Sequence, residues 1–155
     1  GGCLNQAGTS TRLLPAGSLS VSATTPGDLS FDAIGGNPFT FAILVSGDNI
    51  GPLNTASPCF GTNSGISGGS ILDGLRCVVS SIQRHGGRPM DANGAVGLTT
   101  NGWGGPNGPT PNIASQGGFV PGQTRYFQVF YRTNAMLSCQ TGQNTSQAVG
   151  VTFQP

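Results

Sequence analysis

The chain contains very little charge: 7% of its 155 residues are charged, against about 25% in an average soluble protein. It has no lysine and no glutamate, because all its cations are arginine and all its anions are aspartate. Lysine and glutamate are among the residues that best fill exposed helix faces, and the abundant glycine and proline are the worst helix formers. These features exclude a helical bundle.

The net charge is only +1, which gives no basic footprint for nucleic acid or for an anionic membrane surface. No apolar run approaches the roughly 18 residues of a spanning helix, so we expect no membrane insertion. No signal peptide is evident, and the start at Gly1 predicts processing or truncation of a longer chain. Hydrophobic residues make up 35% of the chain in short runs, which favours a folded domain over disorder.

Cysteine is scarce and widely spaced, at Cys3, Cys59, Cys77 and Cys139, and His85 is the single histidine. Zinc sites usually draw ligands from close pairs, so we expect no metal and no cofactor. The even number of cysteines favours two disulfides formed in an oxidising compartment. Three pairings are possible; we favour Cys77–Cys139, which would join two strand candidates, and Cys3–Cys59, which would fix the N-terminus. The aspartates all lie near turns, where they are expected to cap the turns.

Short apolar runs predict about eight strands and no long helix. The strand candidates are Ser18–Ala23, Leu29–Ile34, Phe39–Val45, two runs within Ile71–Ile82, Ala95–Thr99, Thr124–Arg132 and Val149–Phe153. Two long loops rich in glycine and proline are expected at Asp48–Ser70 and Asn101–Gln116. The sequence therefore predicts one all-β domain over residues 1–155, an antiparallel β-sandwich of jelly-roll type.

One catalytic motif matches, since Gly65–Gly69 (GISGG) has the G-x-S-x-G form of a hydrolase nucleophile with Ser67 at its centre. Its flanks are loop-like, no helix follows it, and a chain with 27 glycines is expected to contain such a match by chance. His85 stands between Arg84 and Arg88, which predicts a histidine at the surface. We therefore expect no catalytic residues and no enzyme activity.

The aromatic residues are the main candidates for binding or assembly. Along the strand Thr124–Arg132 they fall on both faces, so that one face fills the core and the other is covered by a loop or exposed to a partner. Trp103 would be a stacking platform for a sugar, an anchor in a neighbouring subunit, or a cap on its own sandwich. The candidates are Trp103, Tyr126, Phe127, Phe130 and Tyr131.

Five segments follow one another along the chain: Gly2–Asn5 (GCLN), Asp73–Cys77 (DGLRC), Tyr126–Arg132 (YFQVFYR), Cys139 and Asn144–Thr152. Together they resemble a module of secreted planctomycete-like bacterial proteins, in which G-C-x-N-S, D-G-L-R-C, Y-Q-x-W-Y-R, a cysteine and N-x-[ST]-N-[GA]-V recur in this order. The resemblance carries no catalytic residues. It implies a secreted, non-enzymatic accessory or surface domain with Cys77 and Cys139 as its bridge.

We therefore expect a secreted domain, extracellular or at the cell surface, without catalysis. The favoured role is a self-assembling subunit of a fibre, filament or matrix, whose partner is another copy of the chain. Low net charge removes repulsion between copies, and edge strands without lysine offer backbone groups to a neighbour. Gly1–Leu14 or Val149–Phe153 would be the exchanged element. The alternative is a carbohydrate-binding or adhesive module that recognises a glycan through the Trp103 loop.

Overall fold

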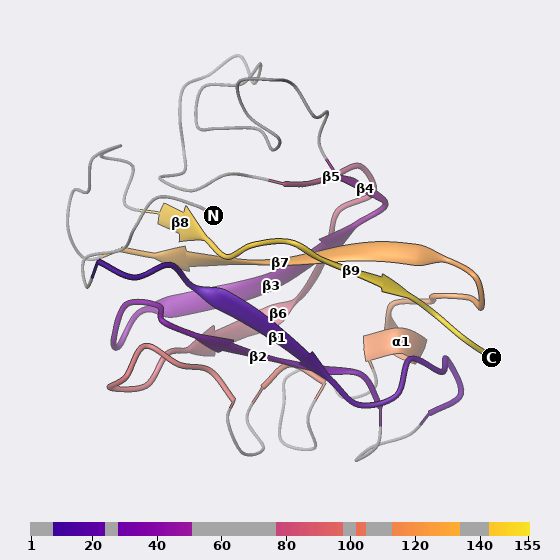
Figure 1. Cartoon of the computed structure of the whole chain (residues 1–155), viewed down its shortest axis with the longest axis horizontal. Coiled ribbons are helices and arrows are strands. Elements are labelled where there is room, and N and C mark those ends of the chain that lie inside the picture. The colour runs from indigo at the N-terminus through magenta and orange to yellow at the C-terminus, as the bar shows by residue number, and fades with distance from the viewer. Residues whose placement is uncertain (1–7, 24–27, 51–76, 98–101, 105–112, 134–142) are drawn as a thin grey trace.

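The computed structural model describes residues 8–23, 28–50, 77–97, 102–104, 113–133 and 143–155, and this part of the chain is mostly β (Figure 1). Its strands pair in antiparallel sheets, the largest of which has five strands, and it has one short helix. The elements are β1 (Arg12–Ala16), β2 (Ser30–Ile34), β3 (Phe41–Gly47), β4 (Asn49–Ile50), β5 (Val78–Val79), β6 (Gln83–Pro89), α1 (Ile113–Gln116), β7 (Thr124–Arg132), β8 (Gln143–Thr145) and β9 (Val149–Thr152). No described helix is long and apolar enough to cross a membrane.

Strand β7 is the centre of the five-stranded sheet. On one side it pairs with β3, from Ala42 opposite Tyr131 to Gly47 opposite Tyr126. On its other side it pairs with β8 near its end and with β9 near its beginning. Strand β6 pairs with the free side of β3, with a register shift in the middle, and forms an edge of this sheet in the described part of the chain.

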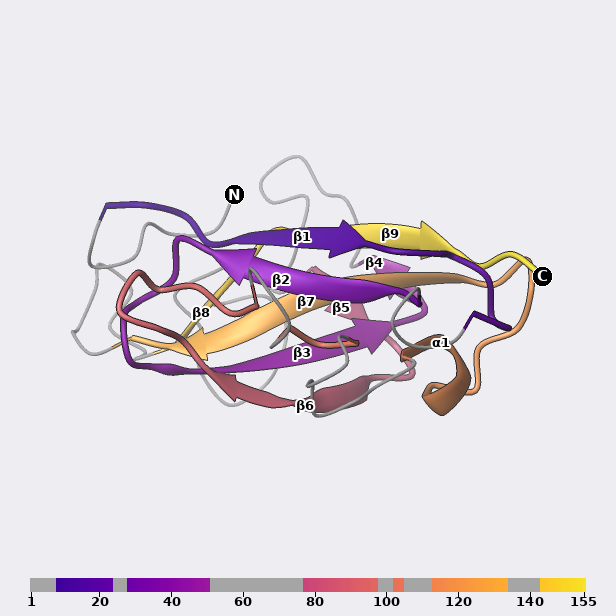
Figure 2. The same cartoon turned by 90° about the horizontal axis from the view of Figure 1, so that it is seen from below.

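The β1–β2 pair forms a second layer on one side of the large sheet (Figure 2). The hydrophobic core lies between the layers, where the rings of Phe31 in β2 and Phe127 in β7 are 4.5 Å apart. Period-2 alternation explains this placement, because Phe127, Val129 and Tyr131 fall on one face of β7 and all three are buried. The prediction that one aromatic face of this strand fills the core is confirmed.

The segment around Trp103 closes the core against β2 and β6. Trp103 exchanges two main-chain hydrogen bonds with Phe31, at 2.7 and 3.0 Å. Its indole Nε1–H donates to the carbonyl of Gly86 in β6 at 2.9 Å. The side chain is 0% exposed, so Trp103 connects the two layers from inside the molecule.

Four strand predictions are confirmed. The bounds of β7 coincide with Thr124–Arg132, and β2, β3 and β9 lie within two residues of Leu29–Ile34, Phe39–Val45 and Val149–Phe153 at each end. These segments combine β-branched or aromatic residues with clear punctuation by glycine and proline.

Other predictions were wrong in position. Ser18–Ala23 contains a turn and one isolated bridge, between Ser20 and Gln154, whereas the strand of this region is β1. The end of the expected loop Asn101–Gln116 forms α1. From Ala95–Thr99 only the bridge of Val96 with Ala33 is described. Residues 51–76 and 98–101 lie outside the described part of the chain. They contain most of the expected loop Asp48–Ser70 and the first run of Ile71–Ile82.

Candidate functional site

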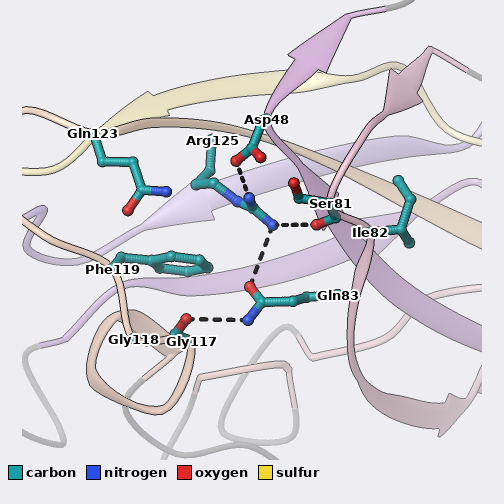
Figure 3. Close-up of a pocket in the computed structure, with 9 residues that line it drawn as sticks. All are labelled: Asp48, Ser81, Ile82, Gln83, Gly117, Gly118, Phe119, Gln123 and Arg125. Atoms are coloured by element: carbon teal, nitrogen blue, oxygen red, sulfur yellow. Dashed lines mark hydrogen bonds and ion pairs between the residues drawn. The ribbon is translucent and has the colours of Figure 1, made fainter.

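An open pocket of about 400 Å³ lies at the end of the large sheet where β3 ends and β7 begins (Figure 3). Its walls come from the residue after β3, the β5–β6 connection, the segment after α1 and the start of β7. The nine lining residues are Asp48, Ser81, Ile82, Gln83, Gly117, Gly118, Phe119, Gln123 and Arg125.

Arg125 is the central residue of this pocket and is only 3% exposed. Its Nη1 forms an ion pair with Asp48. Its Nη2 donates to the hydroxyl of Ser46 at 3.2 Å, the carbonyl of Ser81 at 2.9 Å and the side-chain oxygen of Gln83 at 3.2 Å. A buried charge must be paired and hydrogen-bonded to be tolerated. Groups from β3 and the residue after it, from the β5–β6 connection and from β6 bond both Nη atoms, whereas Nε has no hydrogen-bond partner among the described residues.

Asp48 remains accessible although it is paired, since its side chain is 38% exposed. The pKa of its carboxyl is lowered because Ser81 hydrogen-bonds to it and Arg125 lies beside it, which together outweigh its partial desolvation. The carboxylate is therefore ionised at neutral pH and forms the negatively charged wall of the pocket.

The aromatic ring of the pocket has no open face. The guanidinium of Arg125 lies 5.2 Å from the centre of the Phe119 ring, and Phe153 stacks on Phe119 with ring centres 4.8 Å apart. Phe119 is buried as a result. Sugar recognition usually needs an exposed aromatic face, and this ring does not offer one.

Among the described residues, one contact resembles catalytic machinery: Ser46 Oγ lies 2.8 Å from His85 Nε2. A serine beside a neutral imidazole is the beginning of an activated nucleophile. Burial, assisted by the charge of Arg125, lowers the pKa of His85 to about 4, so the ring is neutral at pH 7. Both side chains are buried, however, and substrate has no access to the hydroxyl. The arrangement stabilises the sheet end and provides no reaction site.

The expectation of a surface histidine was therefore wrong. His85 lies in β6, which its polar and glycine-rich sequence does not identify as a strand. It is the one residue of β6 that is fully buried. Its ring packs against Phe127 with centres 5.5 Å apart. Pairing of β6 with β3 directs the imidazole inward, and no sequence spacing indicated that pairing.

The proposed binding and assembly residues are mostly interior. Trp103 is fully buried, so its use as a sugar platform or an intersubunit anchor was wrong, and it caps its own core instead. Phe127 and Tyr131 are also buried core residues and are not available to a partner. Tyr126 and Phe130 lie half-buried on the other face of β7.

Cys77 is buried and disulfide-bonded. Cys3, Cys59 and Cys139 lie outside the described residues, as does Ser67, so both pairings remain predictions. Within the described ranges, no group of three or more histidine, cysteine or acidic residues could hold a metal ion. Among the aspartates, Asp91 caps its own loop as expected, since its Oδ1 accepts the N–H groups of Asn93 and Ala95 at 2.8 and 2.9 Å.

The opposite end of the sheet carries two exposed aromatic rings that the sequence analysis did not single out. Phe39, in the turn before β3, is 78% exposed, and Phe41, the first residue of β3, is 50% exposed. The Phe41 ring lies directly over Gly87 of β6, where a side chain would overlap it. A run of strand-forming residues concealed them, because such residues are usually placed in the core.

No protein-family model, no curated protein and no solved structure matches the chain. The resemblance to the secreted planctomycete-like module accordingly stays a prediction.

Proposed function

We propose that this protein is a non-catalytic extracellular structural domain that assembles with copies of itself into a fibre, filament or matrix. In this proposal the two layers form a jelly-roll-like β-sandwich, secreted and held by the Cys77–Cys139 and Cys3–Cys59 disulfides. The observation that carries it is the exposure of both Phe39 and Phe41, two residues apart in the chain, at one end of the sheet. Large apolar side chains exposed to water in the same region of a protein often mark a surface that contacts another protein.

Two further properties support association of identical chains. Strand β6 is an edge strand, and no other strand pairs with its outer side among the described residues. The chain contains no lysine, the residue that most often protects such edges. Its net charge of +1 gives little repulsion between copies.

The oxidised, purified chain tests this proposal. Sedimentation velocity over a concentration series should show growth from monomers to large species, and negative-stain microscopy should show fibres or sheets. Substituting Phe41→Ser should reduce that growth while leaving the far-ultraviolet circular dichroism unchanged, because Phe41 is an exposed residue at the beginning of its strand. A strictly monomeric species at the highest soluble concentration would overturn the proposal.

The alternative of a carbohydrate-binding module receives no support from the described residues. Trp103, on which that hypothesis rested, is buried, and the ring of Phe119 in the pocket is covered by Arg125 and Phe153.

A further inference from the structure

We propose that Ser46, His85 and Arg125 act as an acid-sensitive latch on the bend that connects β5 to β6. The bend consists of Ser80 and Ser81, and Ser81 lines the pocket drawn in Figure 3. Uptake of a proton by His85 releases the bend from Arg125 and opens the pocket end of the sheet, while the core between the two layers stays folded. This change does not depend on self-assembly of the chain.

The bend is held in a backbone conformation that serine rarely adopts. Ser80 has a φ of 61° and Ser81 a φ of 44°, both in the left-handed region, which is unfavourable for residues other than glycine. Both residues are exposed, so hydrogen bonds rather than packing hold them. Arg125 Nη2 donates to the Ser81 carbonyl at 2.9 Å, and Asp48 N donates to the Ser80 carbonyl at 3.1 Å. Loss of the Arg125 bond therefore allows a strained segment to relax.

The hydroxyl of Ser46 couples His85 to Arg125. It lies 2.8 Å from His85 Nε2 and accepts a hydrogen bond from Arg125 Nη2 at 3.2 Å. A guanidinium can only donate, so the proton of the Ser46 hydroxyl is available to the Nε2 lone pair of the neutral imidazole. A protonated ring carries a proton on Nε2 as well, and Arg125 and His85 would then both donate to one hydroxyl oxygen. Protonation thus places two cations on the same small group.

The closed arrangement is unfavourable for two cations. Arg125 and His85 are both buried, and both face the ring of Phe119, with the guanidinium 5.2 Å and the imidazole centre 6.1 Å from the ring centre. Asp48 is already ion-paired with Arg125. Burial first, and the charge of Arg125 second, accordingly lower the pKa of His85 to about 4. A proton on His85 therefore favours an arrangement in which Arg125 has moved away.

The other described aspartates are placed away from this cluster or form no bond with it. Asp28 precedes β2, and neither of its carboxylate oxygens has a hydrogen-bond partner. Asp32 lies on the face of β2 that points away from the core, and Asp91 caps a loop beyond the other end of β6. Neither β3 nor the segment from α1 to Gln123 contains a charged residue. The remaining charged or titratable groups of the strands around His85 are Arg12 in β1, Arg84 and Arg88 in β6, and Tyr126, Tyr131 and Arg132 in β7.

The pocket gives Arg125 a way to water. Arg125 lines this open hollow of about 400 Å³, and Figure 3 shows its guanidinium bonded to Asp48, Ser81 and Gln83. A guanidinium that turns into the hollow loses its bonds to Ser81 and Gln83 and gains hydration. The wall formed by these two residues is then no longer tied to β7, so water reaches the imidazole of His85.

Amide hydrogen exchange, followed by NMR on the oxidised full chain, tests the latch. The Asp48 amide reports the bend, because it donates to the Ser80 carbonyl, and the Phe31 amide reports the core, because it donates to the Trp103 carbonyl. Between pH 7 and about pH 4.5 the protection factor of Asp48 should fall roughly 50-fold, since the open form takes up a proton near pH 6.5 and the closed form only near 4. The carboxyl of Asp48 stays ionised in this range, because its pKa lies below 3.8.

Low concentrations of urea distinguish opening of the bend from unfolding of the whole domain. Opening the bend exposes little surface, so exchange at Asp48 should be nearly independent of urea, whereas exchange at Phe31 should be slower and accelerate with urea. Equal protection and equal urea dependence of the two amides would mean that only global unfolding exposes them, and the latch would be overturned. A protection factor of Asp48 that does not change with pH would overturn it as well.

Three variants assign the effect to its parts. His85→Gln should abolish the pH dependence at Asp48, while the matched control Arg84→Gln, which removes an exposed cation from the same strand, should keep it. Ser80→Gly should relieve the positive φ and raise the protection of Asp48 roughly 5-fold at both pH values. Persistent pH dependence in His85→Gln would overturn the role of His85. Should that variant not fold, Ser80→Gly still tests the latch, because Ser80 is exposed and unchanged protection would show that the bend is not the part that opens.

Discussion

The side-chain amide of Gln147 forms two hydrogen bonds with the main chain of Leu13, one with its N–H and one with its carbonyl. Its Oε1 accepts from Leu13 N at 3.1 Å, and its Nε2 donates to Leu13 O at 3.0 Å. Leu13 lies in β1, whereas Gln147 lies in the connection between β8 and β9. The Gln147 side chain therefore provides hydrogen-bond partners for one residue on the outer edge of β1, and it joins the two-stranded sheet to the five-stranded sheet.

Replacing Gln147 should test this link. Gln147→Ala leaves a partly buried N–H and a partly buried carbonyl of Leu13 without their partner, which should cost about 1–3 kcal/mol of unfolding free energy. Gln147→Glu, matched in shape, keeps the acceptor but turns a carboxylate oxygen towards the Leu13 carbonyl, so at neutral pH it should be at least as destabilised as the alanine variant. Urea denaturation followed by circular dichroism measures both. Gln116→Ala, at an exposed residue of α1, should change stability by less than about 0.5 kcal/mol.

Trp103 offers a second test, because its burial predicts the opposite of a ligand-binding residue. Trp103→Ala should lower the unfolding free energy by about 3–5 kcal/mol, since it removes a fully buried indole and its hydrogen bond to Gly86. As Trp103 is the only tryptophan, its fluorescence should be blue-shifted in the folded protein and move to the red on unfolding. A variant as stable as the wild type would contradict the core placement.

The sequence predicted the strands that carry their own signal. The nine residues of β7 are uninterrupted by glycine or proline, and their alternation predicted that one of two aromatic faces fills the core; the structure shows that it is the face of Phe127. Prediction from the sequence pattern failed for β6, because Gly86 and Gly87 indicate a turn when only their immediate neighbours are considered. Pairing with β3 overrides that preference, and the Phe41 ring covers the space that Gly87 leaves empty.

Strand β1 was missed for a related reason. It contains Pro15, which has no N–H and is tolerated only at a sheet edge. Within the described residues β1 pairs with β2 alone, so Pro15 stands at such an edge. The side chain of Gln147, which is distant in sequence, forms two hydrogen bonds with Leu13 of the kind that a further strand would have formed with β1.

The pocket could be predicted only in part. Arg125 shares the face of Phe127 and Val129 by period-2 alternation, which is a signal for a buried cation. Its partners Asp48 and Ser81 come from other elements, and their sequence positions show no related spacing. Tertiary pairing of β3, β6 and β7 brings these groups together, and that pairing cannot be read from one chain segment.

Alanine substitutions at Gly94 and Gly122 distinguish the stability cost of backbone strain from that of a steric overlap. Both have positive φ, at 68° and 82°, so alanine is strained at either position. At Gly122 no atom lies near the added methyl group, whereas at Gly94 the methyl group would overlap the carbonyl of Gly36. We expect Gly122→Ala to cost about 1 kcal/mol and Gly94→Ala more than about 3 kcal/mol. Thermal unfolding of the two variants measures the difference, and equal losses would show that the Gly36 contact is not close.

His85 predicts an acid-sensitive stability. The unfolded chain takes up a proton on this histidine near pH 6.5, whereas the folded protein does so only near its pKa of about 4. Between these values the unfolded state binds more protons, so lowering the pH favours unfolding. The contribution is complete above about pH 6.5, decreases as the pH falls towards 4, and totals about 3 kcal/mol. The lowered pKa of Asp48 acts in a separate window, since stability from that group is lost only below its ordinary value of 3.8.

The matched variant is His85→Gln, which can still hydrogen-bond to Ser46 but cannot take up a proton in this range. It should be less stable than the wild type at pH 7 because the packing of the imidazole against Phe127 is lost. Its unfolding free energy should nevertheless stay nearly constant from pH 6.5 to 4.5, while that of the wild type declines. Since the chain has no other histidine, the difference between the two curves reports His85 alone. Parallel curves would mean that water reaches the imidazole in the folded protein, and the Ser46–His85 contact would then lie at an open surface.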